Sequence, residues 1–353
     1  MTKNDLISFL IKKPSYLKKG PGYLSRTFNV TVDEARIALK EVKEKRNEGF
    51  KWDYNIVAKQ VSDAEVFVAK FEEHQKKFKQ ALIFPSQAEV KTYNDHKVFR
   101  TPSIKEQVGM HILLGCNHVP FHNRQLHAGI LELIKDFPKL KGFHLLGDFL
   151  DLNPLSSHDK GKFTAIPGLT LNDEYQIGKD LLYDFNAVLP KDCWKTYLYG
   201  NHEDRYNRWM SDMNNAKTPL ISPEDGLGLW ELGYNVKTSW SQDYITLGLN
   251  FDIFHGIYFS IHNGKAHLDK LRRSCAYVHT HRAQMYREGE MAAYNIGSCA
   301  DFKSKAFNYA NRAMKASWSN GFAINMIDEN GISHITQIYV DPQGHFFFGG
   351  KRY

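Results

Sequence analysis

The chain has 353 residues, of which 42% are hydrophobic and 24% are charged, and this composition lets a soluble globular protein bury a sizeable core. Its apolar runs fall short of the roughly eighteen residues that a membrane helix needs, and residues 6–11 are too short for a signal peptide. We therefore expect a cytoplasmic protein with no membrane partner. The four cysteines have no paired spacing, as expected for reduced thiols.

The net charge of +7 is concentrated near the N-terminus, where residues 1–60 carry thirteen Lys and Arg against seven Asp and Glu. Residues 4–12 and 23–28 predict two short helices, and a third helix is expected to begin at Thr31, with Glu34 completing a capping box. The exposed face of the third helix carries the cations Arg36, Lys40 and Lys43.

A short helix, a tight turn and a capped basic helix resemble a helix-turn-helix unit that binds DNA, with these three cations on phosphates. The alternative is a small three-helix module that binds protein or only packs. We expect residues 1–60 to form this all-α domain. Residues 61–105 are expected to connect it, through an amphipathic helix at 63–82 and a polar segment at 86–106, to a domain at 106–353.

From residue 108 onward, short apolar runs alternate with amphipathic segments, a pattern typical of buried strands and helices in an α/β domain. The expected strands are 111–114, 143–146, 194–199, 244–249, 251–254 and 275–278. The expected helices are 124–137, 170–188, 203–213 and 262–271. The late strands 292–296, 322–328, 333–340 and 345–348 are expected to form a second sheet.

Polar motifs follow or end five of these strands, and the carboxyl ends of such strands meet in one crevice. The motifs are Cys116-Asn117-His118, Gly147-Asp148-Phe149-Leu150-Asp151, Gly200-Asn201-His202-Glu203-Asp204-Arg205, His255-Gly256 and His279-Thr280-His281-Arg282. An Asp, an Asn and several His on successive strand ends indicate a site for two metal ions.

This order of motifs resembles the calcineurin-like metallophosphoesterase superfamily, over about residues 109–353. The flanks 119–123 and 318–322 resemble its phage-borne members. The resemblance implies a four-layer α/β/β/α sandwich, here preceded by the small all-α domain. It also implies a phosphoesterase in which two metal ions activate a hydroxide, with a phosphodiester, plausibly in nucleic acid, as the substrate.

The same resemblance implies the ligands of two divalent transition metal ions, with Asp148 as the bridge. One ion would take His118, Asp148 and His281, and the other would take Asp148, Asn201, His255 and His279. Imidazole ligands suit Mn, Fe, Zn, Ni or Co. His202 would act on the leaving group with Asp151 as its partner. Arg205 would hold a phosphate oxygen, unless it forms only a surface salt bridge.

The first motif departs from the family, which usually has Asp-x-His where this chain has Cys116-Asn117-His118. A thiolate at Cys116 could replace the missing carboxylate as a ligand to Zn or Fe. The alternative, which we favour slightly, is that Cys116 fills space as a small hydrophobe and the first metal site is weak or empty.

Three functions remain open at this point. The first is a phage phosphoesterase that acts on nucleic acid and has an N-terminal domain for DNA. The second is a phosphatase or cyclic-nucleotide phosphodiesterase that this domain only localises. The third is a catalytically weakened protein that acts in DNA binding or virion assembly, and Cys116 is the residue that favours it. A phage-encoded protein would work in the host cytoplasm or, in the third case, in the virion.

Overall fold

The computed structural model describes residues 6, 7, 10, 21–40, 42, 100–156, 168–212 and 220–353. The chain divides into two compact units, Met1–Asn94 and Asp95–Tyr353, which are taken separately below. None of the helices within the described ranges is both long enough and apolar enough to cross a membrane. The division into residues 1–60, 61–105 and 106–353 stays a prediction.

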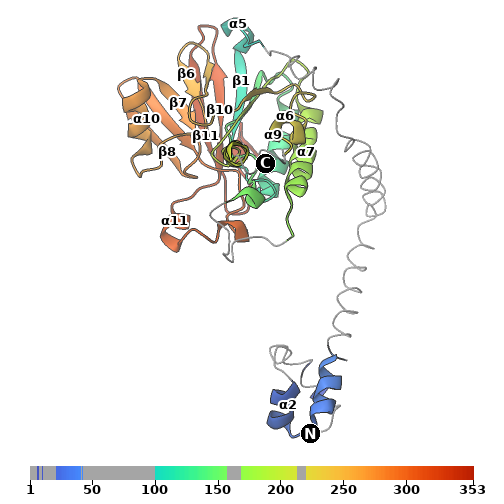
Figure 1. Cartoon of the computed structure of the whole chain (residues 1–353). Helices are drawn as coiled ribbons and strands as arrows, with labels where there is room; N and C mark the ends of the chain where they lie inside the picture. The colour runs from blue at the N-terminus through green and yellow to red at the C-terminus, as the bar shows by residue number, and fades with distance from the viewer. Residues whose placement is uncertain are drawn as a thin grey trace. The chain divides into compact units, whose positions relative to one another are not determined.

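The described part of the first unit is helical, with α2 at Pro21–Phe28 and a further helix at 32–40 (Figure 1). Thr31 caps the second of these helices, because its Oγ1 accepts the Glu34 N–H at 3.1 Å and its own N–H donates to Glu34 Oε2 at 2.8 Å. The helices bury a small apolar core that contains Leu6, Leu10, Leu24, Ala35, Ala38, Leu39 and Val42. The predicted helix at 63–82 lies outside the described residues.

The first sheet of the second unit has six strands in the order β11-β10-β1-β2-β3-β4. These strands are β1 Gly109–Leu114, β2 Gly142–Leu145, β3 Trp194–Leu198, β4 Asn235–Lys237, β10 Gly321–Ile327 and β11 Ser333–Tyr339. The four strands β1 to β4 are parallel, and β10 and β11 are antiparallel to their neighbours. The strands β1, β2 and β3 therefore end at the same edge of the sheet.

Two helices cover one face of this sheet, α6 at Arg124–Asp136 and α7 at Leu171–Val188 (Figure 1). Each begins at a residue whose side chain accepts a backbone N–H: Asn123 caps α6 and Thr170 caps α7. The apolar side of α6 recurs at helical spacing, at Leu126, Ile130, Leu133 and Ile134, and it is fully buried. Both starts were predicted from the sequence to within one residue.

The second sheet has five strands in the order β5-β6-β7-β9-β8. These strands are β5 Ile245–Leu247, β6 Phe251–Ile253, β7 Ser274–Tyr277, β8 Ala283–Glu288 and β9 Met291–Ile296. A second apolar core joins the two sheets, with Leu113 and Leu146 from the first and Ile253 and Ala276 from the second. Helix α10, Asn263–Leu271, packs on β8 and β9 (Figure 1). The domain is thus the predicted four-layer α/β/β/α sandwich.

The late strands correct one expectation, because only 292–296 joins the second sheet. Strand β10 pairs with β1, with Ile324 opposite Ile112, and β11 pairs with β10. The segment 345–348 contributes β12 Phe347–Phe348, which pairs with β13 Lys351–Arg352. An apolar pattern identifies a strand but not its sheet. Strand β10 is buried on both faces. Its pairing with β1 places it inside the first sheet, where both of its faces can be covered.

Short elements complete the described part of the second unit. They are α5 Ile104–Gln107, η3 Asn153–Leu155, α8 Asp204–Ser211, α9 Pro223–Leu227, η4 Lys305–Phe307 and α11 Arg312–Ala316. Among these, α8 was expected from the sequence, while α5 falls in a segment that was expected to be irregular.

Candidate metal centre

The five polar motifs lie at the carboxyl ends of five strands that belong to both sheets. Cys116 and His118 follow β1, Asp148 and Asp151 follow β2, and Asn201 and His202 follow β3, while His255 follows β6, and His279 and His281 follow β7. The ligand atoms of these residues converge in three overlapping groups in which the atoms lie within 4.8 Å of one another. The groups are Cys116, His118, Asp148 and His281; Asp148, His255 and His279; and His118, Asp151 and His202.

The backbone of these loops is held in the left-handed region at five of the motif residues. The φ angles are 47° at Cys116, 51° at His118, 49° at Asp148, 64° at His279 and 57° at His281. A non-glycine residue in such a conformation costs roughly 1–3 kcal/mol, and residues of this kind concentrate at functional sites, where the surrounding structure holds them.

A close approach between two motifs explains why glycine is needed at Gly200. A Cβ atom at this position would lie 2.1 Å from Asp148 Oδ1 and 2.3 Å from the Asp148 nitrogen. Backbone hydrogen bonds also join the loops after β1 and β2, from Cys116 N–H to Gly147 O and from His118 N–H to Asp148 O, both at 2.9 Å. The motifs are therefore fixed to one another through the main chain.

The first ligand group presents a free imidazole nitrogen from His118. His118 Nδ1 donates to the Asp151 carboxylate at 3.0 Å, so its Nε2 carries the lone pair. That Nε2 lies 3.0 Å from His281 Nε2 and 3.8 Å from Asp148 Oδ2. Burial, and then His118, hold the pKa of His281 well below its usual range, so the imidazole is neutral and can act as a ligand.

The second ligand group surrounds His255. The Nδ1 of His255 donates to Leu146 O at 2.9 Å, which leaves Nε2 facing three further ligand atoms. These atoms are Asn201 Oδ1 at 3.0 Å, His279 Nδ1 at 3.1 Å and Asp148 Oδ2 at 3.3 Å. Carboxylate and amide oxygens only accept, so neutral histidines would leave several acceptors facing one another, and a metal cation would satisfy all of them.

Charge in the centre is concentrated on Asp148, which belongs to both groups. Burial opposes its ionisation, but His255 and His202 beside it hold its pKa well below the usual range. The same interaction affects His255. Burial lowers the pKa of His255, Asp148 raises it, and the net effect is a rise. An ionised carboxylate with one imidazole group on each side fits the role of a bridge between two ions, so the residues present fit the implied metals.

Cys116 lies in the first ligand group but already has a partner. Its Sγ accepts the His279 N–H at 3.2 Å, and the side chain is fully buried. Burial, and then Asp148, raise the pKa of the thiol well above its usual value. The position therefore provides a neutral thiol when no cation is nearby, and both interpretations of the first motif stay predictions.

His202 belongs to the third of these groups, and Arg205 lies beside it without belonging to any group. His202 Nδ1 donates to Asp151 O at 2.8 Å, so Nε2 is the acceptor of the bond from Arg205 Nη2 at 3.3 Å. Arg205 Nη1 also donates to Asp151 O at 2.8 Å. The Arg205 side chain is only 13% exposed and lies 4.0 Å from the Asp151 carboxylate, and its role at a phosphate oxygen stays a prediction.

Glu203 supports the site, although the sequence had suggested no role for it. This fully buried carboxylate accepts the N–H groups of Asp148, Leu150 and Gly200 at 2.8–3.0 Å and the Tyr197 hydroxyl at 2.9 Å. It thereby joins the loops after β2 and β3. The signal that could have revealed it is its place in Gly-Asn-His-Glu, where a carboxylate follows a buried strand.

Aromatic rings flank the ligands on both sides. The Trp240 ring lies 6.4 Å from His255 and 6.1 Å from His279, measured between ring centroids. The Trp318 and Phe302 rings lie 4.8 Å and 5.7 Å from His281. Trp318 belongs to a flank noted in the sequence, whereas nothing in the sequence had marked Trp240.

Comparison with known proteins gives structural neighbours only. No family model and no curated protein matches the chain. Vps29 from Cryptosporidium parvum is 12% identical, over 70% of this chain and 95% of its own, with a TM-score of 0.35. Wild-type Vps29 complexed with Zn2+ from Entamoeba histolytica is also 12% identical, over 69% and 96%, with a TM-score of 0.35. A predicted phosphoesterase from Streptococcus pneumoniae is 15% identical, over 69% and 97%, with a TM-score of 0.30.

Similarity at this level assigns no family and no activity. The sandwich architecture rests on the strand order and layers of the chain itself, and the metal centre rests on its own ligand geometry.

Proposed function

We propose that the protein is a metal-dependent phosphoesterase whose substrate is a phosphodiester in nucleic acid. The observation that carries this proposal is the double use of Asp148, whose carboxylate belongs to two ligand groups at the ends of neighbouring strands. His202 Nε2 lies 4.0 Å from Asp148 Oδ2, and Arg205 contacts His202, so the two supply a proton-transfer group and a cation. This set suits the hydrolysis of a phosphate ester.

His118, Asp148 and His281 would hold one ion, and Asp148, Asn201, His255 and His279 would hold the other. When bound, two ions of Mn, Fe, Zn, Ni or Co would neutralise phosphate charge and lower the pKa of a coordinated water.

The chain's own contribution to the reaction centres on His202. The Asp151 carbonyl and carboxylate fix the imidazole, with Nδ1 2.8 Å from the carbonyl oxygen and 3.3 Å from Oδ1. Arg205 occupies Nε2 in the absence of substrate. A substrate phosphate would compete for the guanidinium and leave His202 Nε2 free to take up a proton from solvent. The protonated His202 would then donate that proton to the leaving oxygen.

Turnover by the purified chain tests this function. Protein supplied with Mn, Fe, Zn, Ni or Co should hydrolyse bis(p-nitrophenyl) phosphate with at least one ion and lose the activity on chelation. His202→Ala should keep the metal content and reduce kcat by about a hundredfold or more, the usual scale for a general acid or base.

An absence of turnover with all five ions would favour the alternative of a catalytically weakened protein that acts in DNA binding or virion assembly. The observation behind that alternative is Cys116, which is a neutral buried thiol where the resembling family has a carboxylate. If His202→Ala retains full activity, the role given to His202 is wrong, whatever the metal does.

We further propose that the N-terminal unit binds DNA through phosphates. Arg36 and Lys40 are exposed on the helix at 32–40, while Lys43 lies outside the described residues. Arg36 forms an exposed ion pair with Asp33 at 2.9 Å, an interaction that contributes little and that a phosphate could replace. A phage-encoded protein with these properties would act in the host cytoplasm, or in the virion if the weakened alternative holds.

A further inference from the structure

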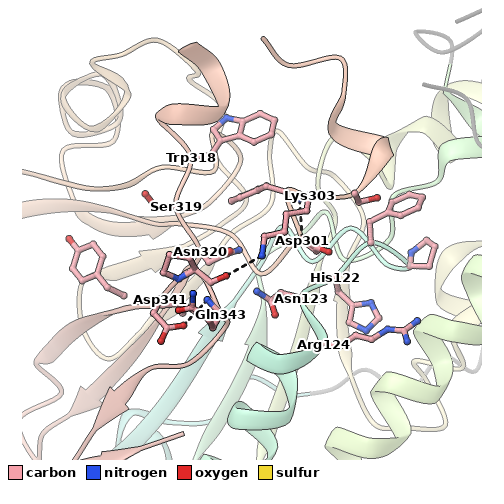
Figure 2. A pocket seen from close by; sticks show the side chains of 17 residues that line it. His122, Asn123, Arg124, Asp301, Lys303, Trp318, Ser319, Asn320, Asp341 and Gln343 are labelled. Carbon is pink, nitrogen blue, oxygen red and sulfur yellow. Dashed lines mark hydrogen bonds between the residues drawn. The ribbon is translucent and has the colours of Figure 1, made fainter. Parts of the chain in front are cut away.

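A cavity of about 840 Å³ is lined by none of the candidate ligand residues. Figure 2 shows the side chains that line it. Four segments form its walls, at 120–124, 301–304, 318–320 and 339–343. The first and third of these belong to the flanks 119–123 and 318–322, which the sequence analysis singled out and which the metal chemistry does not use. Two distant parts of the chain thus come together around one polar hollow.

One wall of the cavity is aromatic and contacts a residue of the candidate metal centre. The Phe302 and Trp318 rings lie 5.0 Å apart, with an interplanar angle of 45°. Both rings also contact the ligand His281. Trp318 is only half-buried, and Tyr339, which is 64% exposed, lies at the rim. A planar ligand ring could therefore stack on this wall without displacing a core residue.

Two cations, Arg124 and Lys303, line the cavity. Figure 2 shows the Arg124 side chain pointing away from Lys303 and Trp318, which leaves Lys303 as the cation nearer the aromatic wall. The Lys303 ammonium has a long contact of 3.4 Å to Pro342 O. Burial, and then His127 and Arg124, lower the pKa of His122 to about 3, so this imidazole adds no charge at neutral pH.

The two carboxylates of the cavity differ in how far they are engaged. Asp341 Oδ1 accepts the N–H groups of Gln343 and His345 at 2.9 Å and 2.8 Å, and Oδ2 lies 3.5 Å from Arg352. Asp301 uses one oxygen, which accepts the Lys303 N–H at 3.0 Å. Its other oxygen is available within the described structure to accept from a ligand hydroxyl or amino group.

We propose that this cavity binds a nucleotide, with the base against Phe302 and Trp318 and the phosphate at Lys303. The open oxygen of Asp301 accepts from the ribose hydroxyls or from the base. An aromatic wall, an open cation and one open carboxylate in a single cavity match the three parts of a nucleotide. Binding itself requires no metal. The role of the cavity in holding the polynucleotide next to the cleaved phosphate rests on the proposed function.

Binding of AMP to the full chain in the presence of a chelator tests the proposal, because chelation removes both turnover and binding to metal ions. Calorimetry should show saturable binding. Adenosine and ribose 5-phosphate should each bind at least about tenfold more weakly, since each lacks one of the recognised parts. Equal binding of ribose 5-phosphate would show an anion site without base recognition and would overturn the proposal, as would an absence of AMP binding.

Two neighbouring lysines provide a matched pair of variants. Lys303 and Lys305 are both exposed, but only Lys303 lines the cavity. Lys303→Ala should weaken AMP binding by about tenfold or more, the scale of one charged hydrogen bond, and Lys305→Ala should leave it unchanged. Equal effects of the two variants would contradict binding in this cavity.

Tryptophan fluorescence locates the ligand independently. AMP should quench the wild-type emission, whereas Trp318→Phe should lose that response and keep a similar calorimetric affinity because it retains an aromatic ring. Quenching that persists in Trp318→Phe would place AMP elsewhere and overturn the proposal. These measurements can fail while metal-dependent hydrolysis succeeds, and the reverse also holds, so the two proposals are tested separately.

Discussion

A single carboxylate, Asp151, organises two imidazoles of the centre that have different tasks. It accepts from His118 Nδ1 at 3.0 Å and lies 3.3 Å from His202 Nδ1. Its interaction with His118 leaves a lone pair that points at the ligand group, and its contacts with His202 hold the ring beside Arg205. The sequence resemblance had given Asp151 only the second of these tasks.

Cys116 is the residue at which the chain departs from the resembling family, and substitutions there are the most informative. Because its Sγ already accepts the His279 N–H, we expect it to fill space and not to bind the ion. Cys116→Ala should then leave the metal stoichiometry unchanged. Cys116→Asp should raise the Mn content of the first ligand group and raise hydrolysis by about tenfold or more, since an oxygen ligand suits Mn.

Cys116→Asn is the matched control for the second variant, because it has the size of Asp without the charge and should raise neither quantity. Metal content by elemental analysis decides the matter. A loss of about one ion per chain in Cys116→Ala would show instead that the thiolate is a ligand. If Cys116→Asp alters neither content nor rate, the assignment of the first motif is mistaken, and His118 loses its role with it.

The convergence of the five motifs could be predicted from the sequence because each follows or ends a short apolar strand, and the carboxyl ends of such strands collect in one crevice. The division of their residues into two ligand sets came from the family resemblance and stays a prediction. Glu203 and Trp240 could not be assigned in this way. The role of Glu203 depends on N–H groups from two other loops, and that of Trp240 depends on a loop that brings it against His255 and His279. Neither relation has a local pattern in the chain.

At the scale of the element, helices were predicted more reliably than sheet membership. Capping residues and the spacing of apolar side chains are local signals, and they located the starts of α6 and α7 closely. Strands β10 and β11 belong to the first sheet, where β10 is buried on both faces. This burial depends on contacts between distant parts of the chain, so no local pattern in the sequence reveals it. The strand β8 was missed because none of its side chains is buried.

The helix at 32–40 is the element on which the DNA proposal can be tested. Arg36→Glu combined with Lys40→Glu should weaken binding to DNA of any sequence and reduce the slope of log K against log salt by about one for each phosphate that is no longer neutralised. Filter binding over a series of salt concentrations measures both. Lys135→Glu, an exposed charge reversal in α6, should change neither. Binding independent of salt, or absent at low salt, would instead indicate a module that binds protein.

The stability of the whole molecule should fall as the pH is lowered, because several histidines are buried and uncharged. Burial lowers the pKa of His111 to about 4, and its Nδ1 lies 3.0 Å from Nε2 of His144, whose pKa burial also lowers. The unfolded chain takes up a proton at each such site near its usual pKa of about 6.5, while the folded chain does not. Stability is therefore retained above that pH and is lost between about pH 6.5 and 4.

Urea denaturation of chelated protein at pH 7, 6 and 5 measures this effect, which is about 1.4 kcal/mol per pH unit for each such histidine. His111→Gln should reduce the pH dependence relative to wild type at the same pH interval. His262→Gln is the control, since the His262 side chain is exposed and forms no hydrogen bond or ion pair with any residue that the structure describes. An identical pH dependence in all three proteins would show that the buried histidine pair does not contribute.

The most direct test of the account is the location of metal ions in crystals of the protein soaked with Mn or Zn. Anomalous scattering should show an ion between Asp148, Asn201, His255 and His279, because this group has a complete set of oxygen and nitrogen ligands in contact with the shared carboxylate. A second ion, in contact with Asp148 Oδ2, is expected at His118 and His281. The absence of any transition metal from the Asp148 carboxylate in metal-supplemented protein would contradict the two-metal centre and the phosphoesterase function built on it.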